Sequence, residues 1–200
     1  MKTVIIKYNA GNTQSVIYAL ERLGVEALIT DVEEEIRSAD HVIFPGVGEA
    51  STSMNYLKER NLDKVIKSLK QPVLGICVGM QLLCAHSEEN DVECMGVFDV
   101  NIKKFKNVNG SKEKIPQMGW NKIYNLKSSL LKNVKEQEFV YFVHSYYAPV
   151  CENTIATTDF IQPFSAAIQK DNFYALQFHT EKSSDAGAVI LSNFLNISAN

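Results

Sequence analysis

Apolar residues in the first half of the chain follow two alternating patterns. Short apolar runs, of a length typical of buried strands, are separated by longer segments whose apolar residues recur with the period of a helix. The runs predict strands at residues 3–8, 27–30, 41–44 and 72–76. The periodic segments predict helices at 16–24 and 51–69, and the acidic residues 31–35 predict a solvated helix or loop. Strands that alternate with helices predict a doubly wound, mostly parallel α/β sheet.

After about residue 90, the pattern changes to polar segments and short β-type runs. We expect antiparallel strands and hairpins here, at residues 97–102, 121–124, 139–144 and 165–168. The basic stretch 103–114 is expected to be an exposed hairpin, and a last helix at 186–195 is expected to pack on the core. Because no repeat, low-complexity tract or linker interrupts the chain, we expect a single domain over residues 1–200.

Composition and charge narrow the possible functions. The 200 residues are 46% hydrophobic and 22% charged, with a formal net charge of −3, which gives no reason to expect nucleic acid or an anionic membrane as partner. The apolar core of residues 4–6 is too short for a signal peptide, and no run is long enough to span a membrane. The four cysteines show no C-x-x-C spacing, so we expect a cytoplasmic location. The four histidines are scattered, so we expect no metal site, and we expect no cofactor.

One cysteine stands between two glycines where a predicted strand meets a helix. Residues 75–79 read Gly-Ile-Cys-Val-Gly, directly after an apolar run. This is the sulfur equivalent of the G-x-S-x-G nucleophile elbow, in which glycines permit a tight, strained turn. The N-terminus of the following helix would favour the thiolate of Cys77, and the amide of Val78 would point at a developing oxyanion. The alternative is a buried structural cysteine.

A histidine and a glutamate near the C-terminus are suitable partners for this cysteine. His179 and Glu181 follow the mostly apolar residues 173–178. On an extended chain, residues i and i+2 project to the same face, so the carboxylate can hold one ring nitrogen while the other faces a thiol. With Cys77, the pair predicts a Cys-His-Glu catalytic triad.

Further segments are similar to one enzyme family over nearly the whole chain. The elbow and the His-x-Glu pair resemble those of the class I, triad-type glutamine amidotransferases. The segments Phe-Pro-Gly-Val-Gly at 44–48 and Met-Gly-Trp-Asn at 118–121 resemble, within that family, the glutamine amidotransferase subunits of imidazole glycerol phosphate synthases. The other similar segments are residues 10–12, 19–24, 75–83, 116–117, 141–146 and 177–183. The resemblance implies a flavodoxin-like fold with antiparallel additions to its parallel sheet.

The resemblance also implies a role for each matching residue. Cys77 would attack the side-chain amide of L-glutamine to give a glutamyl thioester. His179 would carry the thiol proton to the leaving ammonia, and Glu181 would orient the imidazole. The amide of Val78 and one from the loop at Val47 and Gly48 would form the oxyanion hole. The α-amino and carboxylate groups of glutamine would be held by Gly48, Gln81 and the backbone of Ser145 and Tyr146, while His144 is expected to be structural.

A protein partner is implied as well. Family members of this kind pass ammonia to a (β/α)8-barrel cyclase, with which they form a heterodimer in histidine biosynthesis. The implied interface residues are Asn12, Trp120, Tyr141 and Lys182. The only tryptophan could instead be part of the core. The cyclase would convert a phosphoribulosyl formimino-carboxamide nucleotide (PRFAR) into imidazole glycerol phosphate and the purine-pathway carboxamide AICAR.

Three positions depart from the family pattern. Thr180 stands between the catalytic histidine and glutamate, where proline is usual, but threonine prefers extended backbone and the pairing is expected to survive. Gln117 stands where histidine is frequent, and residues 7–9 read Lys-Tyr-Asn in place of Asp-Tyr-Gly.

Other functions remain open on the sequence. The main alternative is a triad glutamine amidotransferase that feeds ammonia to another pathway, of the surface-sugar, pyridoxal phosphate, purine or anthranilate type. A free-standing cysteine hydrolase is disfavoured by the His-x-Glu pair, and a non-catalytic scaffold is disfavoured because Cys77, His179 and Glu181 are all present.

Overall fold

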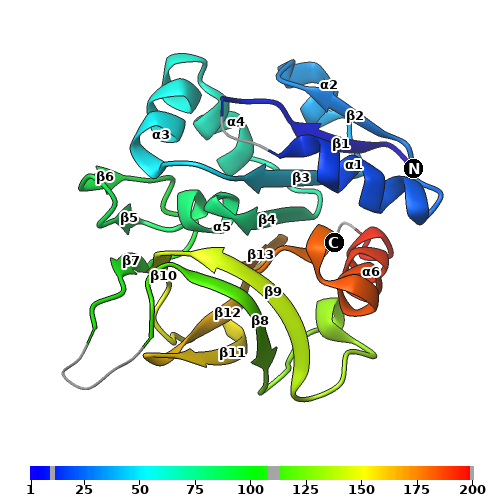
Figure 1. The fold of residues 1–200 in the computed structure, drawn as a ribbon. Coiled ribbons are helices and arrows are strands. Elements are labelled where there is room, and N and C mark those ends of the chain that lie inside the picture. Colours follow the sequence, from blue (N-terminus) through cyan, green and yellow to red (C-terminus); the bar gives the residue numbers. More distant parts are fainter. Residues whose placement is uncertain (10–11, 108–112, 199–200) are drawn as a thin grey trace.

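A seven-stranded sheet runs through the centre of the molecule (Figure 1). The computed structural model describes residues 1–9, 12–107 and 113–198. The sheet has the order β11-β12-β13-β4-β3-β1-β2. Its parallel strands are β1 (Thr3–Ile6), β2 (Ala27–Thr30), β3 (His41–Gly46), β4 (Val73–Cys77) and β13 (Phe173–Leu176), and its antiparallel strands are β11 (Thr154–Phe160) and β12 (Gln162–Lys170). The predicted mostly parallel sheet with antiparallel additions is confirmed.

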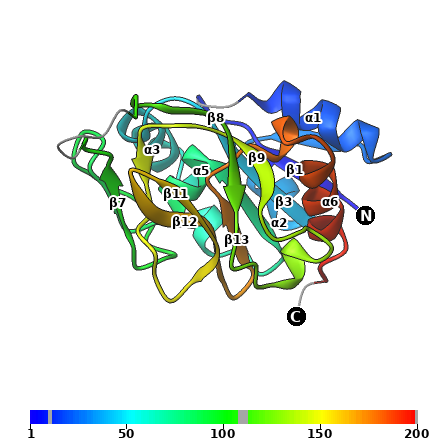
Figure 2. The same ribbon diagram turned by 60° about the horizontal axis from the view of Figure 1, so that its bottom comes forward.

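Two smaller sheets carry the remaining strands. One has the order β10-β7-β5-β6, with β5 (His86–Ser87), β6 (Val92–Glu93), β7 (Asn101–Lys104) and β10 (Tyr146–Tyr147). The other pairs β8 (Gln117–Ile123) with β9 (Glu138–His144). Figures 1 and 2 show β8 and β9 curving side by side from the region of β7 and β10 towards α6 (Ser184–Leu195).

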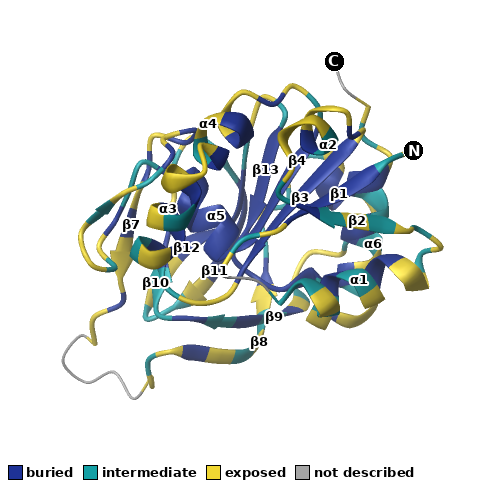
Figure 3. Ribbon diagram, turned by 90° about the horizontal axis from the view of Figure 1, so that it is seen from above, coloured by how far each residue is buried: buried dark blue, intermediate teal, exposed yellow. Residues whose placement is uncertain are grey.

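Helices cover both faces of the central sheet. The helices α2 (Glu33–Arg37), α3 (Ala50–Glu59), α4 (Leu62–Lys67) and α5 (Val78–Leu83) pack among themselves and on one face. On the other side lie α1 (Thr13–Arg22), α6 and two short 3-10 helices, η1 (Ser129–Leu131) and η2 (Thr180–Lys182). Figure 3 shows the buried central strands between these two groups of helices. This double covering is why these parallel strands are apolar on both faces.

Several boundaries differ from the sequence prediction, among them those of β8, which begins at Gln117 rather than at 121, and of β12, which spans Gln162–Lys170 rather than 165–168. The helix expected at 51–69 is two helices, α3 and α4, because Asn61 adopts a left-handed conformation (φ 55°) that asparagine tolerates better than most residues. The strand expected at 97–102 begins only at Asn101. The first strand ends at Ile6, and the strand before His179 ends at Leu176.

The basic stretch 103–114 also differs from its expected form. Its first residues belong to β7, which pairs with β5 and with the distant β10 and not with a neighbouring strand in a hairpin. Residues 108–112 of the stretch lie outside the described residues, as do residues 10–11 of the first family-like segment. None of the described helices has the length and apolar character needed to cross a membrane.

Candidate active site

The register of three parallel strands brings the predicted site residues to one edge of the sheet. Gly46, the last residue of β3, pairs with Cys77, the last residue of β4. On the other side of β4, Ile76 pairs with Leu176 at the end of β13. The loop after β3, the cysteine and the segment that leads to His179 therefore emerge side by side at the carboxyl ends of the strands, where ligands bind in open α/β sheets.

The cysteine occupies a strained turn. Cys77 has φ 54° and ψ −110°, a conformation that non-glycine residues rarely adopt. The neighbouring glycines provide space rather than positive φ angles: a Cβ atom on Gly79 would lie 1.9 Å from the carbonyl oxygen of Phe44. The elbow was expected from its sequence, but the strain falls on the cysteine itself, and Gly79 lets α5 start directly against β3.

His179 and Glu181 form a close buried pair. Their Nδ1 and Oε1 atoms are 2.6 Å apart, and both side chains are 2% exposed. The extended chain that the sequence suggested ends at His179, since Glu181 lies in η2. The contact is thus made across a 3-10 turn, which begins at the buried Thr180, the residue that stands in place of the usual proline.

The backbone around His179 is fixed by β9 and by the start of α6. The amide of His179 donates to the carbonyl of Tyr141 at 2.9 Å. The hydroxyl of Ser183 donates to the carbonyl of His179 at 2.6 Å and accepts from the amide of Tyr141 at 2.9 Å. The segment that carries His179 is therefore tied to β9 both directly and through Ser183, which fixes the backbone from which the imidazole projects.

The charge state of His179 depends on its two neighbours. Burial alone would lower the pKa of the imidazole, but the interactions with Cys77 and Glu181 outweigh it and raise the pKa to about 10. The Nε2 atom is buried and forms no hydrogen bond with any of the described residues. A protonated imidazole beside a cysteine favours the thiolate, so the pair is suited to nucleophilic attack followed by proton donation to a leaving group.

A cavity of about 360 Å³ opens over the cysteine. Its volume suits a small molecule of amino-acid size. Every residue predicted for the oxyanion hole and for substrate binding lies in its wall together with Cys77 and His179: Val47, Gly48, Val78, Gln81, Ser145 and Tyr146. The remaining lining residues are Glu89, Pro116, Val143 and His144. The cavity therefore joins the nucleophile, the imidazole and the two loops that the sequence placed around them.

The loop after β3 has the conformation that its glycines allow. Gly48 has φ +116°, a value that L side chains rarely adopt, and Val47 is 39% exposed. Directly before this loop, the hydroxyl of Tyr8 donates to the carbonyl of Pro45 at 2.6 Å. The hydrogen bond from Tyr8 thus fixes the start of the loop at Pro45, while the part of the loop that faces the cavity lies at the surface.

Glu89 is a residue that sequence reasoning missed. Among the described residues of the cavity wall it is the only acidic one, and its Oε2 accepts a hydrogen bond from the amide of Ala50 at 2.7 Å. Burial raises the pKa of this carboxyl. The polar residues 87–93 contain no pattern that distinguishes Glu89 from Glu88, and only the packing of this loop beside α3 brings it to the cavity.

His144 lies in the same wall but has a structural environment. Its Nδ1 is 2.7 Å from the carbonyl oxygen of Tyr146, and its Nε2 is 3.0 Å from the side-chain amide of Gln117. Burial lowers the pKa of His144 to about 4. A neutral ring with both nitrogens engaged is poorly suited to act as a second base. Gln117, the second departure from the family pattern, is the partner of this histidine.

Three of the four predicted interface residues lie together outside the cavity. Trp120 on β8 is 52% exposed and packs edge-on against Tyr141 on β9, with ring centroids 6.0 Å apart. The Nζ atom of Lys182 lies 5.8 Å from the centre of the Tyr141 ring. Trp120 is therefore not a core residue. Asn12 instead caps α1, where its Oδ1 accepts from the amide of Ser15 at 3.4 Å.

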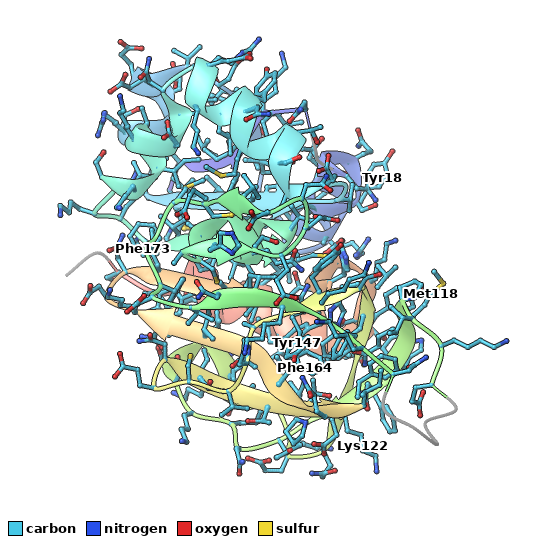
Figure 4. All side chains as sticks on the ribbon, turned by 90° about the vertical axis from the view of Figure 1, so that its left-hand side faces the viewer. Tyr18, Met118, Lys122, Tyr147, Phe164 and Phe173 are labelled. Carbon is cyan, nitrogen blue, oxygen red and sulfur yellow. The ribbon has the colours of Figure 1, made fainter. Side chains whose placement is uncertain are left out.

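Met118 and Phe139 extend this exposed apolar surface on the same pair of strands, at 67% and 47% exposure. Figure 4 shows Met118 projecting away from the body of the protein, whereas Tyr147 and Phe164 lie close together within it. Those two rings are 5.9 Å apart in a buried aromatic cluster. No group of three or more His, Cys, Asp or Glu side chains in the described part of the chain is placed to hold a metal ion.

Comparison with known proteins identifies the family. A model of the family "Glutamine amidotransferase class-I" matches residues 4–197. Proteins named imidazole glycerol phosphate synthase subunit HisH are similar over their full length: that of Bacteroides fragilis is 60% identical and that of Pectobacterium atrosepticum 44%, each across 98% of this chain.

Solved structures show the same fold at low identity. A putative GMP synthase component from Thermoplasma acidophilum is 20% identical, with a TM-score of 0.75 over 98% of this chain and 92% of the other. The PurLQS structure from Thermotoga maritima is 15% identical, with a TM-score of 0.71 over 98% of this chain and 97% of the other. With the match to its family model spanning nearly every residue, the chain belongs to the class I glutamine amidotransferases.

Proposed function

We propose that this chain is the glutaminase subunit of an imidazole glycerol phosphate synthase. It hydrolyses L-glutamine to glutamate and ammonia, and a cyclase subunit uses the ammonia. The observation that carries the chemistry is the position of Cys77 and of the buried His179–Glu181 pair at one cavity. The pathway is supported by the relatives that are 44% to 60% identical along the full chain.

The three residues divide the reaction between them. The thiolate of Cys77 attacks the side-chain amide carbon of glutamine, and the carbonyl oxygen becomes an oxyanion. Protonated His179 gives its Nε2 proton to the amide nitrogen, which leaves as ammonia, and a glutamyl thioester remains on the sulfur. The neutral imidazole then takes a proton from water, which attacks the thioester and releases glutamate. Glu181 stays bonded to Nδ1, so that Nε2 faces the reacting atoms.

The oxyanion requires amide donors at the cavity. We assign one to Val78, whose amide belongs to the residue after the nucleophile, as in other elbows. The second comes from the loop at Val47 and Gly48. Since Gly48 tolerates positive φ angles, the loop can present a peptide N–H in one orientation and a carbonyl in the other. The oxyanion hole can therefore be complete or incomplete without movement of the triad.

The α-ammonium group of glutamine needs hydrogen-bond acceptors or a negative charge, and its α-carboxylate needs hydrogen-bond donors. Gln81 uses its Nε2 for the carbonyl of Tyr146 and for Gln177, and no described residue donates to its Oε1. That oxygen and the carboxylate of Glu89 are suited to the α-ammonium group. The backbone of Ser145 and Tyr146 is suited to the α-carboxylate. A substrate with both an α-ammonium and an α-carboxylate group fits this wall better than a peptide chain does.

Glu89→Gln is expected to weaken glutamine binding. The amide keeps the size of the side chain but removes the negative charge that faces the α-ammonium, so KM should rise about ten-fold or more, as for a lost charge-assisted hydrogen bond, with a smaller change in kcat. Steady-state glutaminase kinetics measure both. Glu88→Gln is the matched control, since Glu88 does not line the cavity, and should leave KM unchanged. An unchanged KM in Glu89→Gln would remove Glu89 from the substrate site.

The partner is a (β/α)8-barrel cyclase, and the heterodimer is cytoplasmic and needs no cofactor for the glutaminase step. The exposed residues Met118, Trp120 and Phe139, with Tyr141 and Lys182, supply an apolar surface with a charged margin, as protein interfaces do. Asn12 lies at the start of α1, which packs against η2 beside Lys182. The cyclase then makes imidazole glycerol phosphate and AICAR from PRFAR.

Gel filtration of this chain with its cyclase should show a stable 1:1 complex at micromolar concentration. Trp120→Ala should weaken the complex by about 2 kcal/mol or more if the side chain is central to the interface. Tyr18→Ala is a control, because Tyr18 is similarly exposed, at 53%, on α1. Two separate peaks for the wild-type chains would favour the alternative, a triad amidotransferase that serves another pathway.

A further inference from the structure

The side chain of Gln177 is fully buried next to the nucleophile but has no part in the triad or in the cavity wall. It follows β13 directly, and its amide N–H donates to the carbonyl of Ala166 at 2.8 Å. The main chain of this residue is therefore fixed by the sheet. A buried side-chain amide is costly unless its donors and acceptors are used, so its partners indicate its role.

A chain of contacts determines which way the amide of Gln177 points. The carbonyl oxygen of Tyr146 can only accept, so the Gln81 atom 3.2 Å away must be Nε2. The same Nε2 is 3.1 Å from Gln177, which must therefore turn its Oε1 towards Gln81. The Nε2 of Gln177 then faces the other way, 3.7 Å from the sulfur of Cys77.

The sulfur of Cys77 thus has one neighbour that accepts hydrogen bonds and one that donates them. A thiol at Cys77 can donate to the carbonyl oxygen of Val143, which is 3.8 Å away. A thiolate cannot, and that carbonyl dipole would disfavour it. The N–H of Gln177 has the reverse preference, because it donates better to a charged sulfur than to a neutral one. The position of Gln177 therefore offsets the effect of the Val143 carbonyl.

We propose that Gln177 is a positioning residue for the nucleophile, which holds the Cys77 thiolate by an N–H···S hydrogen bond and links it through Gln81 to the glutamine-binding wall. The kinetic part of this inference rests on the proposed glutaminase function, whereas the effect on the sulfur does not. Sequence reasoning gave Gln177 no role, because a glutamine at the end of an apolar run carries no signal of its own.

Other titratable groups near the sulfur must be considered in a test based on pH. Tyr8 has a pKa raised well above its ordinary value, first by burial and then by the charge of Cys77, so it stays neutral. His144 is neutral because burial lowers its pKa to about 4. Glu89 lies in the cavity wall, where its negative charge disfavours a thiolate, and His179 favours one. None of these groups is altered by a change to the amide.

The decisive experiment is the pH dependence of Cys77 alkylation by iodoacetamide, followed by mass spectrometry of the peptide that contains Cys77. Gln177→Met keeps an unbranched side chain of similar size and removes the N–H donor. We expect the pH midpoint of alkylation to rise by about one unit, the scale of one hydrogen bond to a charged group. We also expect kcat for glutamine to fall about ten-fold, with KM changed less than kcat.

Ser165→Ala is the matched control. Ser165 is fully buried in β12, the strand next to β13, and its hydroxyl lies 2.7 Å from that of Thr154 and 2.8 Å from the carbonyl of Pro149. Its replacement also removes buried hydrogen bonds, so it should lower the melting temperature without moving the alkylation midpoint. A shift in Gln177→Met that is absent in Ser165→Ala separates the effect on the sulfur from a general loss of stability.

An unchanged alkylation midpoint in folded Gln177→Met overturns the proposal, even if kcat falls. If that variant does not fold, Gln177→Asn replaces it, because asparagine keeps the amide but is one methylene shorter, and its midpoint should also rise. An unchanged midpoint in Gln177→Asn would then overturn the proposal. Since alkylation requires no glutamine, a failure of the proposed glutaminase function would leave this result interpretable.

Discussion

Cys77→Ala is expected to abolish glutamine hydrolysis while the protein remains folded. Among the described residues that line the cavity, only Cys77 carries a thiol, and the imidazole of His179 in the same wall is held by a carboxylate. Alanine is smaller than cysteine and therefore fits in the elbow without a steric clash, so the central sheet should be retained. The loss in kcat should be about 10⁴-fold or more, as for other triads that lose their nucleophile. Ammonia release measures activity, and circular dichroism measures folding.

Other triad variants should follow the same logic. His179→Ala should cost about as much as Cys77→Ala, since nucleophile and base act as a unit. Glu181→Gln should be milder, because an amide can still accept from Nδ1, but the loss of its charge should lower the raised pKa of His179. Any alkaline loss of activity caused by deprotonation of this imidazole should then move to lower pH.

Cys94→Ala is the control for Cys77→Ala, since Cys94 does not line the cavity. A folded Cys77→Ala protein that releases ammonia at the original rate would exclude Cys77 as nucleophile.

Binding of the cyclase with its nucleotide ligand is expected to raise the glutaminase kcat by about 10²- to 10³-fold, the value of one oxyanion donor. In the isolated chain, Nδ1 of His179 is already 2.6 Å from Oε1 of Glu181, and Cys77 and His179 line the same cavity. What can still change is the loop at Val47 and Gly48, which faces the cavity at the surface. A partner that biases this loop towards the N–H-inward orientation would complete the oxyanion hole.

The increase should appear in kcat rather than in KM, because an oxyanion donor acts mainly in the transition state. Steady-state kinetics of the chain alone, with cyclase, and with cyclase plus nucleotide measure both constants. Gly48→Ala should reduce the activation, since a Cβ atom limits the peptide orientations that glycine allows at this position, where φ is +116°. Full activity of the isolated chain, or activation confined to KM, would contradict the oxyanion switch.

The sheet could be predicted from the sequence because its strands are apolar runs separated by helices of clear period. The segments 27–30 and 139–144 were predicted within a residue of β2 and β9. The break at Asn61 was not predicted, because neither glycine nor proline marks it and the apolar stripe continues on both sides. The two-residue strands β5 and β6 were missed for another reason: they are too short to show a pattern, and they are defined by pairing, of β5 with β6 and of β5 with β7.

In the site, too, features that are local in sequence could be predicted, whereas features that depend on tertiary packing could not. The cysteine elbow and the His-x-Glu pair are local in sequence, so the catalytic role that we propose for them could be suggested before their geometry was known. The geometry predicted for the His179–Glu181 contact was partly wrong, because Glu181 reaches His179 from a 3-10 turn and not along a strand. The roles that we propose for Glu89 and Gln177 could not be predicted, since the positions of these residues arise from tertiary packing: a loop beside α3 in one case and the β13–β4 register in the other.

The most direct test of the central claim is product formation by the reconstituted complex with glutamine as the only nitrogen source. With PRFAR and without ammonium salts, this chain and its cyclase should form imidazole glycerol phosphate and glutamate in equal amounts. The complex that carries Cys77→Ala should form none from glutamine but should regain synthesis when ammonium is added, because the cyclase itself is intact. Undiminished synthesis from glutamine by the Cys77→Ala complex, or no synthesis by the wild-type complex, would contradict the account.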